Sequence, residues 1–195
     1  QTKIGHGDQP NQKELTCLAS YKSLSTYPWC HSVKFPKNLN QLEKRHILDP
    51  LVESQLQKSI SRVKSPNQTD ETLNDQCGSQ PYPRWENVGL SCKSESLQQH
   101  LKATANINIS RPPCGTTEQL QILILGCKTG QDAIETTSKF SACNILAVDP
   151  NISNLAYARR KTNELGLTNI QFRQADMTDF DHLSSRFDVI VCSEG

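Results

Sequence analysis

The stretch LQILILGCKTG, residues 120–130, decides the fold. Its first six residues form a nearly continuous apolar run, which is typical of a parallel strand buried on both faces. A loop bounded by Gly126 and Gly130 follows the run. Glycine has no Cβ, so such a loop lets the backbone approach a ligand closely. The stretch therefore predicts a buried strand that leads into a ligand-binding loop.

The same pattern of strand, loop and helix continues downstream. The sequence predicts a helix around 132–140, a strand over 144–148, a helix from Ser153 to a left-handed end at Gly166, and strands over 170–173 and 187–192. Strands that alternate with helices predict parallel pairing with right-handed crossovers. We expect an α/β fold with four parallel strands.

The region before residue 120 is more polar. The chain is 35% hydrophobic, below the roughly 45–50% usual for globular domains, and most of its apolar runs lie after Leu120. We divide the chain into a helical connector over 1–63, a linker with a PYPRW arm over 64–119, and the α/β part over 120–195.

Two features stand out in the polar region. Asp49-Pro50 predicts a helix start, because Asp can cap free N–H groups and Pro suits the first helical position. Apolar residues from Leu48 onward recur at helical spacing and predict a stripe: Leu48, Val52, Leu56, Ile60 and Val63. Packing of the stripe on a neighbouring part of the chain is the favoured interpretation, and a protein-binding face is the alternative. In the arm, two prolines enforce an extended chain that displays Tyr82 and Trp85. Packing of the arm on the following domain is the favoured interpretation, and a ligand lid is the alternative.

Composition excludes several function classes. The formal net charge is +1, from 21 Lys and Arg against 20 Asp and Glu, so nothing indicates a nucleic-acid or anionic membrane partner. No run of about 18 apolar residues is present to span a membrane. The eight cysteines form no C-x-x-C pair, so no metal site is predicted. We expect reduced thiols and a cytoplasmic location, since no secretory signal is seen.

Carboxylates follow two of the predicted strands. Asp149 ends the second strand, where it could accept hydrogen bonds from both ribose hydroxyls of a nucleoside. Asp176 lies just past the third strand, where it could accept one from an adenine amino group. Because ligands of open α/β sheets bind beyond the carboxyl ends of the strands, the loop and the two carboxylates together predict a nucleoside-type cofactor.

Other phosphate-binding loops fit less well. A P-loop needs G-x-x-x-x-G-K-[ST], but Gln121 stands where its first glycine would fall and Cys127 separates Gly126 from Lys128. The dinucleotide fingerprint G-x-G-x-x-G lacks its second and third glycines, at Lys128 and Gln131.

The remaining pattern resembles class I S-adenosylmethionine-dependent methyltransferases, in particular the bacterial group fused to tetratricopeptide repeats. The resemblance is carried by ILILGCKTGQDAIE, ILAVDPNISNLAYARRKTNELGLTNIQF, QADMTDF and FDVIVCSEG, and more loosely by LSTYPWCHSV, DPLVESQLQ and PYPRWENVGL upstream. It implies that residues 120–195 are the N-terminal half of a Rossmann-like methyltransferase domain. We therefore expect an internal fragment, with the repeats and further strands lying outside this chain.

The resemblance also implies roles for particular residues, with S-adenosylmethionine as the cofactor. Asp149 with Pro150 would bind the ribose, and Asp176 with Met177 the adenine. Cys192 to Glu194 would lie beside the transferring methyl group. The methionine part of the cofactor would be cradled by the loop residues Gly126, Cys127, Lys128, Thr129 and Gly130.

This chain departs from the family at two positions. Lys128 stands where members usually have glycine, and Ile124 stands where many place an acidic residue for the cofactor's amino group. A side chain at 128 could crowd the cofactor or pair with its carboxylate. We expect the family to bind S-adenosylmethionine and this chain to bind it weakly or not at all.

The implied reaction is direct displacement on the methyl carbon by an unidentified acceptor, which needs alignment more than a general base. No catalytic residue is assigned: Glu194, His182 and Asp181 are interpreted as surface or turn residues. Partners would be the cofactor, the acceptor and a possible protein bound through the missing repeats. Two alternatives stay open, a degenerate domain used for protein contacts and another nucleotide-binding enzyme such as a dehydrogenase.

Overall fold

The computed structural model describes residues 9–63, 80–105, 119–140, 142–176 and 186–192. The chain divides into two compact units, Gln1–Gln55 and Leu56–Gly195. No helix in the described ranges is long and apolar enough to cross a membrane.

The first unit is built from short helices around a small apolar core. Its helical segments are α1 (Gln12–Tyr21), η2 (Leu24–Thr26), η3 (Cys30–Ser32), η4 (Lys37–Leu39), α2 (Asn40–Glu43), η5 (Lys44–Leu48) and α3 (Asp49–Gln57). A capping box starts α1: the Asn11 side chain accepts from the Glu14 N–H at 3.0 Å, and the Glu14 carboxylate accepts from the Asn11 N–H at 2.9 Å. The buried core residues are Leu15, Leu24, Cys30, Val33 and Ile47.

The predicted helix start at Asp49 is wrong, because α2, η5 and α3 follow one another without a break from Asn40. Pro50 lies inside this helical run and has no N–H to donate to the His46 carbonyl four residues earlier. The Ser23 hydroxyl donates to that carbonyl instead, at 3.3 Å. The turn before Pro50 is π-helical, with the Asp49 N–H bonded to the Lys44 carbonyl.

The predicted apolar stripe is also only partly correct. Leu48 and Val52 are 49% and 43% exposed, so they lie outside the buried core. Only its C-terminal residues are covered: Leu56 and Ile60 pack into the core of the second unit, and Val63 packs against a second cluster there. The helix ends at Gln57, before the helical spacing of the sequence pattern does.

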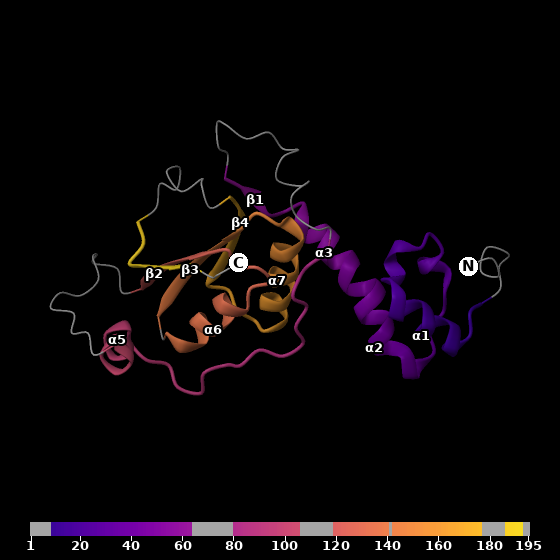
Figure 1. The fold of residues 1–195 in the computed structure, drawn as a ribbon, viewed down its shortest axis with the longest axis horizontal. Coiled ribbons are helices and arrows are strands. Elements are labelled where there is room, and N and C mark those ends of the chain that lie inside the picture. Colours follow the sequence, from indigo (N-terminus) through magenta and orange to yellow (C-terminus); the bar gives the residue numbers. More distant parts are fainter. Residues whose placement is uncertain (1–8, 64–79, 106–118, 141, 177–185, 193–195) are drawn as a thin grey trace. The chain divides into compact units, whose positions relative to one another are not determined.

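The second unit contains a parallel sheet of five strands, ordered β1-β4-β3-β2-β5 (Figure 1). The strands are β1 (Ser61–Arg62), β2 (Leu120–Leu125), β3 (Cys143–Asp149), β4 (Ile170–Gln174) and β5 (Val189–Cys192). The α/β fold and the four predicted parallel strands are confirmed. β1 was not predicted: it is a two-residue edge strand that pairs with Arg173 and Gln174 of β4.

Helices α6 (Gln131–Lys139) and α7 (Ile152–Glu164) pack on one face of the sheet through a shared core, whereas α5 (Leu97–Ala105) lies between β1 and β2 in sequence. As predicted, Gly166 provides the left-handed end of α7 just past the helix, with φ +70°, and the Leu167 N–H bonds back to the Thr162 carbonyl at 3.0 Å. A second apolar cluster covers part of the opposite sheet face and contains Leu123, Leu125, Leu146, Val148 and Ala175.

Candidate functional site

The strand register brings the predicted cofactor residues to one edge of the sheet. Leu125 at the end of β2 pairs with Val148 of β3 and with Cys192 of β5. Asp149 at the end of β3 pairs with Gln174 of β4. The loop after β2, the carboxylate after β3 and the segment after β4 therefore meet at the carboxyl ends of neighbouring strands, where open α/β sheets bind ligands.

The loop between β2 and α6 has an unusual backbone. Gly126, Lys128 and Gly130 all have positive φ, at +65°, +46° and +83°. The loop is closed by the Gly130 N–H, which donates to the Cys127 carbonyl at 2.8 Å, and by the Cys127 N–H, which donates to the Val148 carbonyl at 3.0 Å. Left-handed backbone explains why glycine suits positions 126 and 130, and it makes the lysine at 128 a strained residue.

Asp149 ties the loop to the neighbouring strand. Its carboxylate accepts hydrogen bonds from the Lys128 N–H at 2.8 Å, the Asn151 N–H at 2.9 Å and the Asn154 amide at 3.3 Å. Asp149 is buried. Our sequence analysis missed Asn154, although its place in the first turn of α7, one turn from Asp149, was a usable signal. The two predicted parts of the site are thus in direct contact.

Burial raises the pKa of the Asp149 carboxyl above its ordinary value, and the three N–H donors and the Lys128 charge oppose that rise only in part. An ionised carboxylate is the better acceptor for ribose hydroxyls.

Affinity for a nucleoside-type ligand is therefore expected to fall as the pH falls through this raised pKa, at higher pH than an ordinary aspartate with pKa about 3.9 would give. Titrations between about pH 4 and pH 8 measure this, with Asp149→Asn as the control that cannot titrate. An equal pH dependence in Asp149→Asn would assign the effect to another group.

The side chains of the other two loop residues, Cys127 and Thr129, are buried. Cys127 is buried in the core, and desolvation, followed by the charges of Asp149 and Asp132, raises the pKa of its thiol well above the ordinary value. That thiol is therefore neutral and no nucleophile at neutral pH. Thr129 is also buried, and its hydroxyl donates to the Pro83 carbonyl at 2.7 Å.

The outer predicted residues are placed less completely. Pro150 follows Asp149, and its carbonyl accepts from the Gln174 side chain at 2.8 Å. Asp176 is half-buried and follows Ala175, whose N–H donates to the Asp149 carbonyl at 3.3 Å. Cys192 is an exposed free thiol at the end of β5. Four predicted or weighed residues lie outside the described residues: Met177, Asp181, His182 and Glu194.

The PYPRW arm packs on this domain, as the favoured interpretation expected. The Trp85 indole N–H donates to the Thr129 carbonyl at 3.1 Å, and Pro81 is buried. The sequence did not predict this contact between the arm and the glycine loop, because no local pattern indicates contacts between residues more than forty positions apart.

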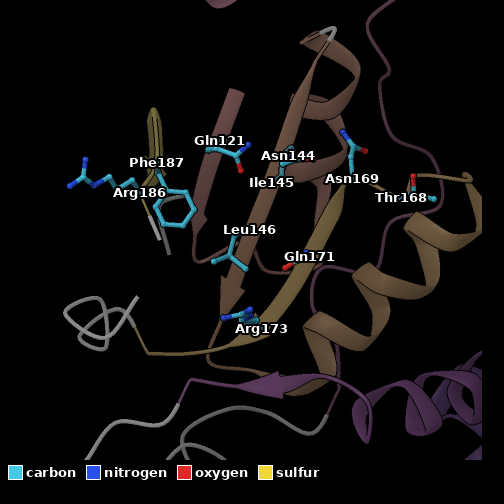
Figure 2. A pocket seen from close by; sticks show the side chains of 10 residues that line it. All are labelled: Gln121, Asn144, Ile145, Leu146, Thr168, Asn169, Gln171, Arg173, Arg186 and Phe187. Carbon is cyan, nitrogen blue, oxygen red and sulfur yellow. The ribbon is translucent and has the colours of Figure 1, made fainter. Parts of the chain in front are cut away.

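A polar pocket of about 250 Å³ lies elsewhere on the sheet (Figure 2). Residues from β2, β3 and β4 line it together with the segments before β4 and β5, and none of them belongs to the glycine loop or to the Asp149 site. Among the described residues, no group of His, Cys, Asp and Glu is arranged to hold a metal ion.

Residues 122–195 match the family described as "Methyltransferase domain". Over 94 residues the chain is 31% identical to an uncharacterized protein of Rickettsia prowazekii, and over 73 residues it is 34% identical to (S)-coclaurine N-methyltransferase of Papaver somniferum. These stretches cover 48% and 37% of this chain, but only 16% and 20% of the two relatives. The chain thus spans a small part of the length of the curated relatives it matches.

Two solved structures show weaker similarity. PKMT2 from Rickettsia typhi in complex with AdoHcy is 21% identical, over 38% of this chain and 15% of that chain, with a TM-score of 0.36. Coclaurine N-methyltransferase bound to N-methylheliamine and SAH is 15% identical, over 94% of this chain and 51% of that chain, with a TM-score of 0.37. These TM-scores are low, so neither structure carries an argument about this chain.

Proposed function

We propose that residues 120–195 bind S-adenosylmethionine, the cofactor that the match to the methyltransferase domain implies, and that the chain serves methyl transfer to an unidentified acceptor. One observation carries the proposal. The Asp149 carboxylate at the end of β3 accepts a hydrogen bond from the Lys128 N–H of the glycine loop at 2.8 Å. The residue proposed to bind the ribose and the loop proposed to cradle the cofactor therefore meet at the carboxyl edge of the sheet.

The residues present fit such a cofactor in part. A carboxylate offers about four acceptor sites, and the three hydrogen bonds described at Asp149 leave capacity for a ribose hydroxyl. Asp176 follows β4, the strand next to the one that ends at Asp149, and is proposed to accept a hydrogen bond from the adenine amino group. The bound sulfonium supplies the activated methyl group. The work left to this chain is to hold the nucleoside, orient it and exclude water.

Lys128 is the poorest fit. Its φ of +46° is a conformation that glycine adopts freely and that costs other residues roughly 1–2 kcal/mol. Its side chain starts from the loop that is proposed to cradle the cofactor. We therefore propose that this chain binds the cofactor weakly.

Lys128→Gly is expected to raise the free energy of unfolding by about 1 kcal/mol and to tighten S-adenosylhomocysteine binding by about fivefold. Chemical denaturation and calorimetric titration measure the two effects. Lys128→Ala is the matched control: it removes the ammonium and the long side chain but keeps a Cβ and the left-handed strain. Equal gains in affinity from both variants would assign the weak binding to the side chain beyond Cβ. No gain in a folded Lys128→Gly chain would contradict crowding.

The same residue favours a second candidate function, a methyltransferase-like domain that has lost catalysis and serves protein contacts. On that proposal neither Lys128 variant binds S-adenosylhomocysteine. The association with tetratricopeptide repeats, and a protein partner bound through them, belongs to the first candidate function and is proposed from the resemblance of the segments upstream of the sheet.

A further inference from the structure

We propose that Trp85 is a positioning residue for the glycine loop, and that residues 81–86 act as a brace holding that loop in its observed conformation. The consequence for cofactor affinity rests on the function proposed above. The brace itself is argued from contacts between residues 81–86, the loop and α7.

The brace contacts the loop through two reciprocal hydrogen bonds at one residue. The Trp85 indole N–H donates to the Thr129 carbonyl at 3.1 Å, and the Thr129 hydroxyl donates to the Pro83 carbonyl at 2.7 Å. Thr129 is 1% exposed and lies between Lys128 and Gly130, both of which have positive φ. The brace therefore bonds both the carbonyl and the hydroxyl of the one residue that separates Lys128 from Gly130.

The other side of the brace is anchored on α7. The Tyr157 hydroxyl donates to the Trp85 carbonyl, and the two rings meet edge to face with centroids 5.7 Å apart. The Lys161 ammonium lies 4.8 Å from the Trp85 ring centroid and donates to the Glu86 carbonyl at 3.0 Å. Trp85 is thus fixed by a regular helix on one side and holds the loop on the other.

The brace also reaches the ribose side of the site. The Tyr82 N–H donates to the Asn154 side-chain oxygen at 3.0 Å, and the same Asn154 side chain donates its amide to Asp149 at 3.3 Å. One short segment is therefore bonded to the loop through Thr129 and to the carboxylate through Asn154. The glycine loop and the Asp149 carboxylate are therefore both held by a segment more than forty residues away in sequence.

Amide hydrogen exchange in the ligand-free chain tests the brace directly. Trp85→Phe removes the indole N–H but keeps an aromatic ring beside Tyr157. We expect the Lys128 and Gly130 amides to exchange about fivefold faster in this variant, the effect of losing one hydrogen bond from the loop. The matched control is Trp29→Phe, which changes the chain's other tryptophan, in the first unit, and leaves loop exchange unchanged. Unchanged loop exchange in folded Trp85→Phe overturns the proposal.

A second measurement leaves Trp85 in place. In the Trp29→Phe chain Trp85 is the only tryptophan, so its fluorescence reports on the brace. S-adenosylhomocysteine is expected to change that emission saturably, with the dissociation constant found by calorimetry. Calorimetric binding without any change in emission counts against the brace.

A purely structural role for Trp85 would lower global stability without raising exchange selectively at Lys128 and Gly130. If loop exchange responds to Trp85→Phe and calorimetry detects no binding by any variant, the brace is supported and the proposed function fails. The two proposals are therefore tested separately.

Discussion

Gly130→Ala is expected to lower the free energy of unfolding by about 3 kcal/mol. Two costs add at this position. Gly130 has φ +83°, where an L side chain is strained, and an added Cβ would lie 2.6 Å from the Cβ of Ala158. Ala158 is fully buried on α7, so it has little room to move. The glycine is therefore required both for the loop conformation and for the close approach of the loop to α7.

Two other glycines separate these costs. Gly166→Ala has the same kind of strain, φ +70°, but nothing lies within 4 Å of its added Cβ, so about 1 kcal/mol is expected. Gly89→Ala has open space and no positive φ, and should be nearly neutral. Urea denaturation of the three variants gives the order. A Gly130→Ala effect no larger than that of Gly166→Ala would show that the contact with Ala158 relaxes freely.

Asp149→Ala is expected to weaken S-adenosylhomocysteine binding by about 10- to 150-fold, because a hydrogen bond to a charged acceptor contributes roughly 1.5–3 kcal/mol. The variant also removes the acceptor of the Lys128 N–H and so releases the loop from β3. Both losses act on the same ligand.

The matched control is Asp188→Ala. The Asp188 carboxylate also accepts a backbone N–H of the sheet, that of Gln121 at 2.8 Å, but it lies near the start of β2 and not at its carboxyl end. Calorimetric titration should find its affinity unchanged. Equal losses in the two variants would mean that sheet integrity, and not a ribose acceptor, determines binding.

Local patterns were sufficient to predict four of the five strands and the edge of the sheet at which the glycine loop and Asp149 meet. The apolar run at 120–125 and the shorter runs after it are buried strands because parallel sheets bury both faces. Once the strands are parallel, the loop after β2 and Asp149 after β3 must lie at the same edge, and the bond between the Lys128 N–H and Asp149 follows from that geometry.

What could not be predicted depends on contacts between distant segments. The edge strand β1 is defined by its pairing with β4 and has no strand pattern of its own. The bond from Trp85 to Thr129 joins positions that no periodicity relates. Asp49-Pro50 was misassigned because the Ser23 hydroxyl bonds the carbonyl that Pro50 leaves without a donor, so the helix continues through the proline.

Nitrogen-15 NMR titration of the chain with S-adenosylhomocysteine tests the central claim most directly, because it locates the ligand as well as detecting it. The account predicts saturable changes in the chemical shifts of the Gly126, Lys128, Gly130 and Asn151 amides, at ligand concentrations that correspond to weak binding. No such changes are expected with NAD, the ligand of a dehydrogenase. Absence of shifts in a chain whose spectrum shows it folded, or shifts confined to the pocket around Asn144 and Gln171, would contradict it.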